Sequence, residues 1–202
     1  MRTIDRMVAG FRSFRAIYYE QRPERVASLV EGGQKPEILL VACSDSRVDP
    51  AILMNAEPGE LFVVRNVAAL VPPYAPDGHY HGTSAALEYA VRDLKVQDII
   101  VLAHSSCGGV SALVAATKHE PMPDREFIQP WMSMMAGAIG DEEPAKASQD
   151  TLRQSIRNLR SFPFVQNAAD LGYLNVHGWW FDMKEGALYR LNEDDGQFVR
   201  IE

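Results

Sequence analysis

The chain has 202 residues, of which 47% are hydrophobic and 23% are charged, a composition typical of a globular protein with a sizeable core. Its formal net charge of -7 argues against a nucleic acid or an anionic membrane as partner, because both attract basic surfaces. Two cysteines are too few for a disulfide framework and indicate a reducing compartment. The charged first residues are unlike a signal peptide, and no run approaches the roughly 20 apolar residues of a membrane span, so we expect a cytoplasmic protein.

The first predicted element is an amphipathic helix over residues 5–20, with Met7, Phe11 and Phe14 at helical spacing. A second, shorter helix over residues 25–30 ends at Gly32-Gly33, a typical C-cap. Large aromatic side chains ahead of the sheet need a surface to cover, and on the pattern alone they pack on their own domain. We assign residues 1–34 to an N-terminal helical arm and residues 35–202 to an α/β domain.

Short aliphatic runs at residues 38–41 and 99–103 predict buried strands of a parallel sheet, with the apolar spacing of a crossover helix between them at residues 82–94. The fold class is therefore α/β, with a mostly parallel central sheet flanked by helices, an N-terminal helical arm and a C-terminal edge hairpin. The remaining expected strands lie over residues 61–64 and 174–182, followed by the hairpin over 187–191 and 198–201. The remaining expected helices lie over residues 110–117 and around 127–135. A further helix carries Leu152, Ile156 and Leu159 and ends before Pro163.

Reactive side chains follow two of these strands. Cys43-Ser44-Asp45-Ser46-Arg47 comes after the first aliphatic run, and His104-Ser105-Ser106-Cys107-Gly108-Gly109 comes after the run at residues 99–103. Because parallel strands joined by a crossover end at the same edge of the sheet, Cys43, His104 and Cys107 can meet at one point. Two thiolates and one imidazole form a three-ligand zinc set with an open fourth position, the pattern of a catalytic site. The alternatives are a pair of buried structural cysteines and a disulfide between Cys43 and Cys107.

Other polar and aromatic residues have simpler interpretations. Asp49-Pro50 is typical of a helix N-cap, so Asp49 is not expected to act as a catalytic acid. His79 and His81 follow a loop over residues 71–78 and have the spacing of a metal pair, but we expect surface residues there. From spacing alone, Phe62, Val67 and Tyr89 are core residues.

Both cysteine-containing segments, together with residues 58–66 (PGELFVVRN) and Glu88-Tyr89-Ala90, resemble the paired signatures of the β-class carbonic anhydrases. The similarity covers nearly the whole chain and is weakest at residues 121–150. It implies a zinc (Zn²⁺) lyase that reversibly hydrates carbon dioxide to bicarbonate and a proton. It also implies a homodimer or a dimer of dimers, with the N-terminal helices lying across the partner subunit.

Asp45 and Arg47 are the candidate catalytic residues beside the zinc ligands Cys43, His104 and Cys107. Two thiolates cancel the formal charge of Zn²⁺, so the ion acidifies a water molecule less than three imidazoles would allow. Asp45 can accept a hydrogen bond from the nucleophile, and a bidentate bond from Arg47 would keep Asp45 ionised and off the metal. The alternative is that the pair only braces the loop.

The resemblance also implies which residues bind substrate. Phe62, Val67 and Tyr89 match the family's pocket lining, and Gln34 matches a glutamine that reaches in from the neighbouring subunit. The backbone N–H of Gly108 is a further donor for bicarbonate.

One branch of the family has an inhibitory bicarbonate site made of a Trp, an Arg and a Tyr. The matching positions here hold Leu40, Arg65 and Phe181, so one donor group of three remains, and we place the chain nearer the plant-type branch without bicarbonate regulation. We expect Arg65 to have a structural role near a carboxylate. Two other functions stay open: hydrolysis of carbon disulfide or carbonyl sulfide at the same zinc set, and a non-catalytic zinc or redox module.

Overall fold

The computed structural model describes residues 2–118, 124–140 and 142–202. The chain divides into two compact units, the first ending at Lys35 and the second beginning at Pro36. In the first unit, α1 (Thr3–Arg15) continues through a π-helical turn (Ala16–Glu20), and α2 (Pro23–Glu31) follows. None of the residues in these fully described helices is buried. The apolar face of α1 stays open, with Met7 57% and Phe11 63% exposed.

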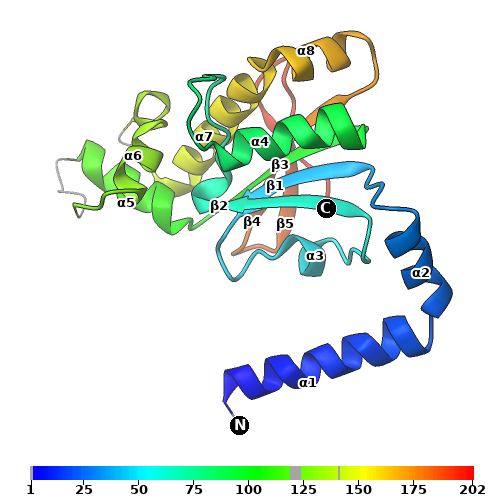
Figure 1. Cartoon of the computed structure of the whole chain (residues 1–202). Coiled ribbons are helices and arrows are strands. Elements are labelled where there is room, and N and C mark those ends of the chain that lie inside the picture. Colours follow the sequence, from blue (N-terminus) through cyan, green and yellow to red (C-terminus); the bar gives the residue numbers. More distant parts are fainter. Residues whose placement is uncertain (1, 119–123, 141) are drawn as a thin grey trace. The chain divides into compact units, whose positions relative to one another are not determined.

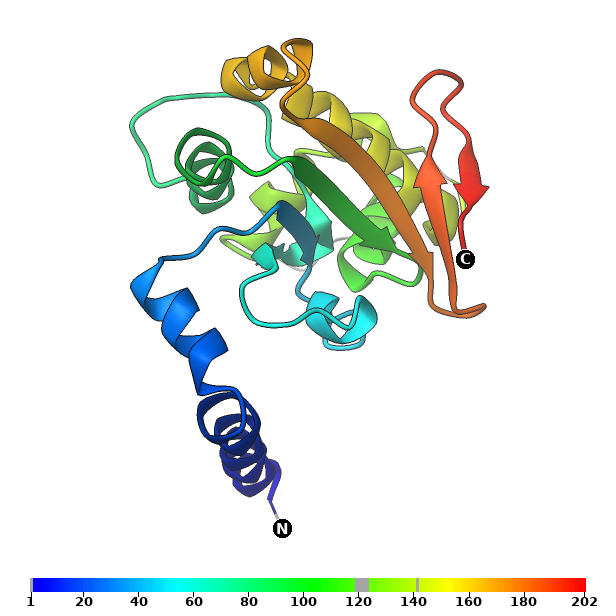
Figure 2. The ribbon, with the colours of Figure 1, turned by 90° about the vertical axis from the view of Figure 1, so that its right-hand side faces the viewer.

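The second unit is built on a six-stranded sheet with the strand order β2-β1-β3-β4-β5-β6 (Figure 2). The first four strands in this order run parallel, whereas β5 and β6 are antiparallel and form the terminal hairpin. The expected mostly parallel sheet with an edge hairpin is confirmed. The strands are β1 (Ile38–Cys43), β2 (Leu61–Asn66), β3 (Asp98–His104), β4 (Asn175–Asp182), β5 (Ala187–Leu191) and β6 (Phe198–Arg200).

Helices cover the two faces of this sheet unequally. α4 (Gly82–Tyr89), α7 (Pro144–Arg160) and α8 (Pro163–Asp170) lie over one face, and the short α3 (Pro50–Leu53) lies on the other (Figure 1). α7 packs on β3 and β4 through the predicted apolar residues Leu152, Ile156 and Leu159, each at most 2% exposed. Burial of such a side chain contributes about 1.5–3 kcal/mol.

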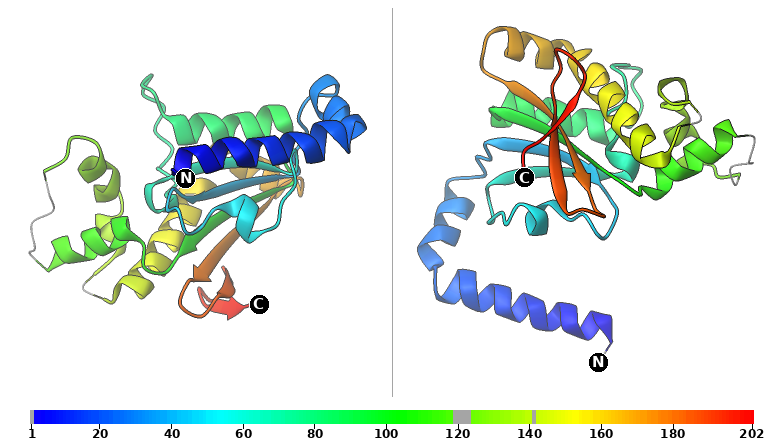
Figure 3. Two further views of the ribbon diagram at one scale, coloured as in Figure 1. Left: turned by 90° about the horizontal axis from the view of Figure 1, so that it is seen from below. Right: turned by 180° about the vertical axis from the view of Figure 1, so that it is seen from behind.

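α5 (Gly108–Thr117) and α6 (Ile128–Ser133) pack against each other beside the sheet (Figure 3). α5 also packs on α7, so it is held where β3 ends. Among the described helices, none has the length and apolar character needed to cross a membrane.

Two features of the connectivity were not predicted. β2 lies between β1 and β3 in the chain but outside β1 in the sheet, so α4 connects β2 to β3 and passes over β1. Pro163 ends α7 but also begins α8, a helix that the sequence did not predict, because proline is tolerated in a first helical turn. The N-cap at Asp49 is confirmed, since its Oδ1 accepts the N–H groups of Ala51 and Ile52 at 3.1 and 3.4 Å.

The parallel strands end together at one edge of the sheet. Cys43 is the last residue of β1 and pairs with Asn66 of β2, and His104 is the last residue of β3 and pairs with Phe181 of β4. Cys107 is the N-cap residue of α5. Strand order and a short loop therefore bring the three predicted ligands to the same edge.

Candidate metal centre

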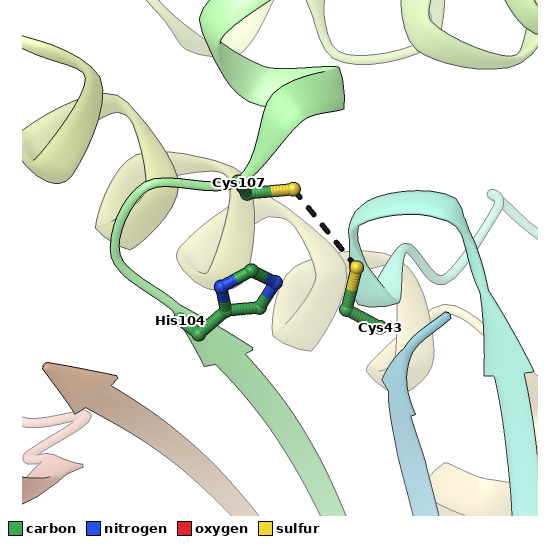
Figure 4. A group of neighbouring side chains, drawn as sticks. All are labelled: Cys43, His104 and Cys107. Atoms are coloured by element: carbon green, nitrogen blue, oxygen red, sulfur yellow. Dashed lines mark hydrogen bonds between the residues drawn. The ribbon is translucent and has the colours of Figure 1, made fainter. Parts of the chain in front are cut away.

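Cys43, His104 and Cys107 converge at the C-terminal ends of β1 and β3 (Figure 4). One ligand atom from each residue lies within 4.8 Å of the others, and the two Sγ atoms are 4.0 Å apart. The three residues are 4%, 1% and 4% exposed. Both cysteines are free, so the disulfide alternative is not what the fold adopts.

The geometry fits a zinc ion. Two Zn–S bonds of about 2.3 Å at a tetrahedral angle would place the sulfurs about 3.8 Å apart. His104 Nδ1 lies 2.8 Å from the carbonyl oxygen of Ser105, which can only accept, so Nδ1 carries the hydrogen and Nε2 the lone pair. Nε2 is buried and has no hydrogen-bond partner among the described residues. A buried lone pair beside two thiols is costly unless it ligates a cation.

The two thiols also favour a cation. The hydrogen bond from Cys107 lowers the pKa of Cys43 to about 4, in spite of its burial. The pKa of Cys107 is raised, first by this hydrogen bond and then by burial. The pair therefore loses one proton readily and keeps the second, until a divalent cation supplies the charge that a second thiolate needs.

Asp45 and Arg47 form the predicted bidentate pair on the turn after Cys43. Arg47 Nε donates to Asp45 Oδ1 at 2.9 Å, and Nη2 donates to Oδ2 at 2.6 Å. The Arg47 backbone N–H donates to Oδ1 as well, at 2.9 Å. These bonds, the side-chain ones first, hold the pKa of Asp45 well below its usual range. Arg47 Nη2 also donates to Ser106 O at 3.1 Å, so the pair connects the two segments that carry the ligands.

Arg65 of β2 secures the same turn. Its Nε donates to Cys43 O at 3.0 Å, its Nη2 donates to Asp45 O at 2.8 Å, and its Nη1 pairs with Asp49 Oδ2 at 2.6 Å. The structural role expected for Arg65, with a carboxylate partner, is confirmed. Leu40 and Phe181, at the other two positions of the inhibitory site, pack in the apolar cluster on one face of the sheet.

The expected substrate-binding residues differ in their surroundings. Phe62 and Tyr89 contact each other, with ring centroids 5.9 Å apart, and Phe62 also packs against the main core. Tyr89 is 45% and Val67 is 36% exposed, so interpreting these two as core residues was wrong. Val67 follows β2 and lines an open cavity of about 850 Å³. Gly108 begins α5, and Gln34 lies in the first unit, where its role stays a prediction.

Residues of α6 next to the metal centre were missed. Trp131 Nε1 donates to Val67 O at 2.8 Å, and Met132 is 1% exposed. A Cβ atom at Gly109 would lie 3.0 Å from Val67 Cγ1 and 3.1 Å from Met132 Sδ, so a side chain there would push these two neighbours aside. A helix around residues 127–135 was expected and is present as α6, but the periodic signal of this segment is too poor to place these side chains at the metal centre.

His79 and His81 lie in the surface loop, as expected. His81 Nε2 is 2.7 Å from Asp77 Oδ1, which also accepts the His79 backbone N–H at 2.9 Å. Within the described part of the chain, the group able to hold a metal ion consists of the three predicted ligands and includes neither of these histidines.

Known proteins are similar to this chain in sequence and in fold. Residues 38–188 match the family model described as carbonic anhydrase. The chain is 34% identical over 205 residues to a carbonic anhydrase of Pseudomonas aeruginosa, across 96% of this chain and 90% of the relative. It is 34% identical over 194 residues to beta carbonic anhydrase 3 of Arabidopsis thaliana, across 91% and 74%.

Two solved structures are similar to this one over almost their full length. The β-carbonic anhydrase CcaA superposes with a TM-score of 0.84 at 28% identity, covering 98% of this chain and 100% of that one. A tetrameric β-carbonic anhydrase of Sordaria macrospora superposes with a TM-score of 0.79 at 28% identity, covering 98% of both chains.

Proposed function

The chain belongs to the β-class carbonic anhydrases, and we propose that it hydrates carbon dioxide reversibly to bicarbonate and a proton at a zinc ion held by Cys43, His104 and Cys107. The observation that carries this assignment is the buried Nε2 lone pair of His104, without a partner among the described residues and beside two free thiols. A zinc ion bound there supplies the Lewis acidity that makes water a nucleophile at neutral pH.

Asp45 orients the nucleophile in this proposal. The bonds from Arg47 lower the pKa of Asp45 and fix its position, and the ionised carboxylate can only accept a hydrogen bond, which selects the lone pair that faces carbon dioxide. Both Asp45 oxygens are tied to Arg47, which keeps the carboxylate from becoming a fourth ligand. The reacting centre therefore stays open to substrate.

Carbon dioxide needs an apolar surface, and bicarbonate needs hydrogen-bond donors. The apolar surface comes from Phe62, Val67 and Tyr89. The proposed backbone donor is the N–H of Gly108, which begins α5 directly after the ligand Cys107. Gln34 supplies a side-chain amide from a second subunit.

The assembly we propose is a homodimer or a dimer of dimers. The apolar face of α1 is exposed, since Met7, Phe11 and Phe14 are 57%, 63% and 37% exposed. A second copy of the chain is the surface that these side chains cover. The Sordaria macrospora relative named above is tetrameric.

In our proposal bicarbonate does not regulate this enzyme through a separate inhibitory site, which places it with the plant-type branch. Leu40 is 1% exposed and Phe181 is apolar, while each guanidinium nitrogen of Arg65 already has a protein acceptor. A bicarbonate ion there would meet neither an indole N–H nor a phenol O–H, only an Arg65 side chain already bound to three protein acceptors. We also propose a cytoplasmic location, which the two free cysteines support.

The test is stopped-flow carbon dioxide hydration by the full chain before and after treatment with a zinc chelator, with zinc restored afterwards. We expect activity that is lost with the metal and returns with it. Release of hydrogen sulfide from carbonyl sulfide or carbon disulfide, faster than carbon dioxide hydration, would favour the sibling hydrolase. Bound zinc without either activity would favour a non-catalytic module.

A further inference from the structure

The loop between the second and third ligands is anchored by residues outside the ligand set. Ser105 is 5% exposed and forms three hydrogen bonds with the end of β4 and the turn after it. Its N–H donates to Phe181 O at 2.9 Å, and its Oγ donates to Asp182 Oδ1 at 3.2 Å. The Met183 N–H donates to Ser105 Oγ at 2.9 Å. The backbone and the side chain of Ser105 are thus both held from β4.

Ser105 in turn holds His104, because its carbonyl oxygen accepts the Nδ1–H of the imidazole at 2.8 Å. The next carbonyl along the loop, Ser106 O, accepts from Arg47 at 3.1 Å. Ser106 has a φ of 57°, a conformation that L residues adopt rarely and that surrounding contacts must maintain. Ser105 and Ser106 therefore hold, through their carbonyl oxygens, both the metal ligand His104 and the Arg47 guanidinium that binds Asp45.

We propose that Asp182 is a positioning residue for the metal centre and acts through Ser105. The carboxylate is itself fixed, since Asp182 Oδ1 also accepts the Lys184 N–H at 2.8 Å in the turn between β4 and β5. A fixed anchor keeps the Ser105 carbonyl facing His104, so the imidazole holds one tautomer and one orientation before the metal arrives. Metal binding then loses less conformational freedom and is tighter. This inference rests on the proposed zinc site.

The experiment measures the zinc affinity of the full chain by competition with a chromogenic chelator. We expect Asp182→Ala and Ser105→Ala to weaken zinc binding roughly 10- to 100-fold, the range for groups that orient a ligand histidine. Asp182→Asn keeps an oxygen acceptor for the Ser105 hydroxyl and should bind zinc within about threefold of the parent. The visible absorption of the cobalt-loaded protein should change in the two alanine variants, because it reports ligand geometry.

Asp195→Ala is the matched control. Asp195 Oδ1 accepts the Gln197 N–H at 2.9 Å in the next hairpin turn, so this residue caps a turn without contacting the ligand loop. Its zinc affinity and cobalt spectrum should equal those of the parent.

Each outcome has a distinct meaning. A parent chain that binds no zinc refutes the proposed function itself. A parent that binds zinc tightly, with Ser105→Ala and Asp182→Ala within twofold of it and spectrally identical, refutes only the inference. Equal weakening in Asp195→Ala also refutes it, because loss of any turn cap would then suffice. If Asp182→Ala does not fold, Ser105→Ala decides, since it removes one hydroxyl and keeps the N–H bond to Phe181.

Discussion

Replacement of Arg47 by Ala separates catalysis from folding at this site. The change removes the two side-chain bonds to Asp45, at 2.9 and 2.6 Å, and the bond to Ser106 O at 3.1 Å. The Arg47 side chain is 57% exposed, so solvent screens its ion pair with Asp45 and the pair contributes little to stability. We therefore expect a folded variant that still binds zinc, because none of the three ligands is altered.

The expected loss is in the rate. Without Arg47 the pKa of Asp45 returns toward the usual aspartate value of about 3.9, so the carboxylate stays ionised at neutral pH and only its position changes. A displacement of about 1 Å in a catalytic group lowers the rate by about 100-fold. We expect kcat/KM for carbon dioxide hydration to fall by about that factor, equivalent to about 2.7 kcal/mol of transition-state stabilisation.

The assay is stopped-flow hydration with a pH indicator, with the zinc content measured on the same samples. Arg47→Lys keeps the charge but cannot form the bidentate fork, so it should recover only part of the rate. Arg92→Ala breaks an ion pair with Glu88 of similar exposure, 58%, outside the metal centre, and should leave the rate unchanged.

Two results would refute this reasoning. If Arg47→Ala and Asp45→Asn both hydrate carbon dioxide at the parent rate with full zinc occupancy, the pair only braces the turn. If Arg47→Ala loses zinc, Arg47 acts on the ligand loop through Ser106 and not on Asp45.

Four further predictions follow from the same site. Replacing Cys43, His104 or Cys107 by Ala should abolish both zinc binding and activity, since a two-ligand site holds zinc poorly. If metal analysis finds the parental zinc content in Cys107→Ala, the assignment of Cys107 as a ligand is wrong. Activity should rise with pH through an apparent pKa above about 7, because two thiolates reduce the charge that acidifies water. Asp45 does not account for this rise, since it is already ionised at lower pH. A rate that is flat from mildly acidic pH upward, measured in a buffered pH series, would contradict this. Dilution to monomers should abolish activity if Gln34 acts across subunits. Sedimentation and rate measurements on the same samples test this, and active monomers would refute the placement of Gln34. Bicarbonate should inhibit without cooperativity, and a steep sigmoidal inhibition curve would show that Arg65 keeps an anion site despite Leu40 and Phe181.

The sequence by itself determined the features that depend on neighbouring residues. Asp45 and Arg47 are two residues apart, so a single turn brings their side chains together and the bidentate pair could be predicted. The Asp49 cap depends on backbone N–H groups two and three residues away. The aliphatic runs before Cys43 and His104 specify buried strands, and parallel strands end at a common edge. The pair and the cap need only residues close in sequence, and the common edge follows from the general rule for strands joined by crossovers.

Only the tertiary structure decided which distant groups support the ligands. Ser105 and Asp182 are 77 positions apart, and Trp131 and Val67 are 64 apart, with no spacing rule connecting either pair. Ser105 reaches Asp182 because β4 pairs with β3 in the register that sets His104 beside Phe181. Strand order and register are set by burial over the whole sheet, since a slip of one residue would turn every buried side chain to the opposite face.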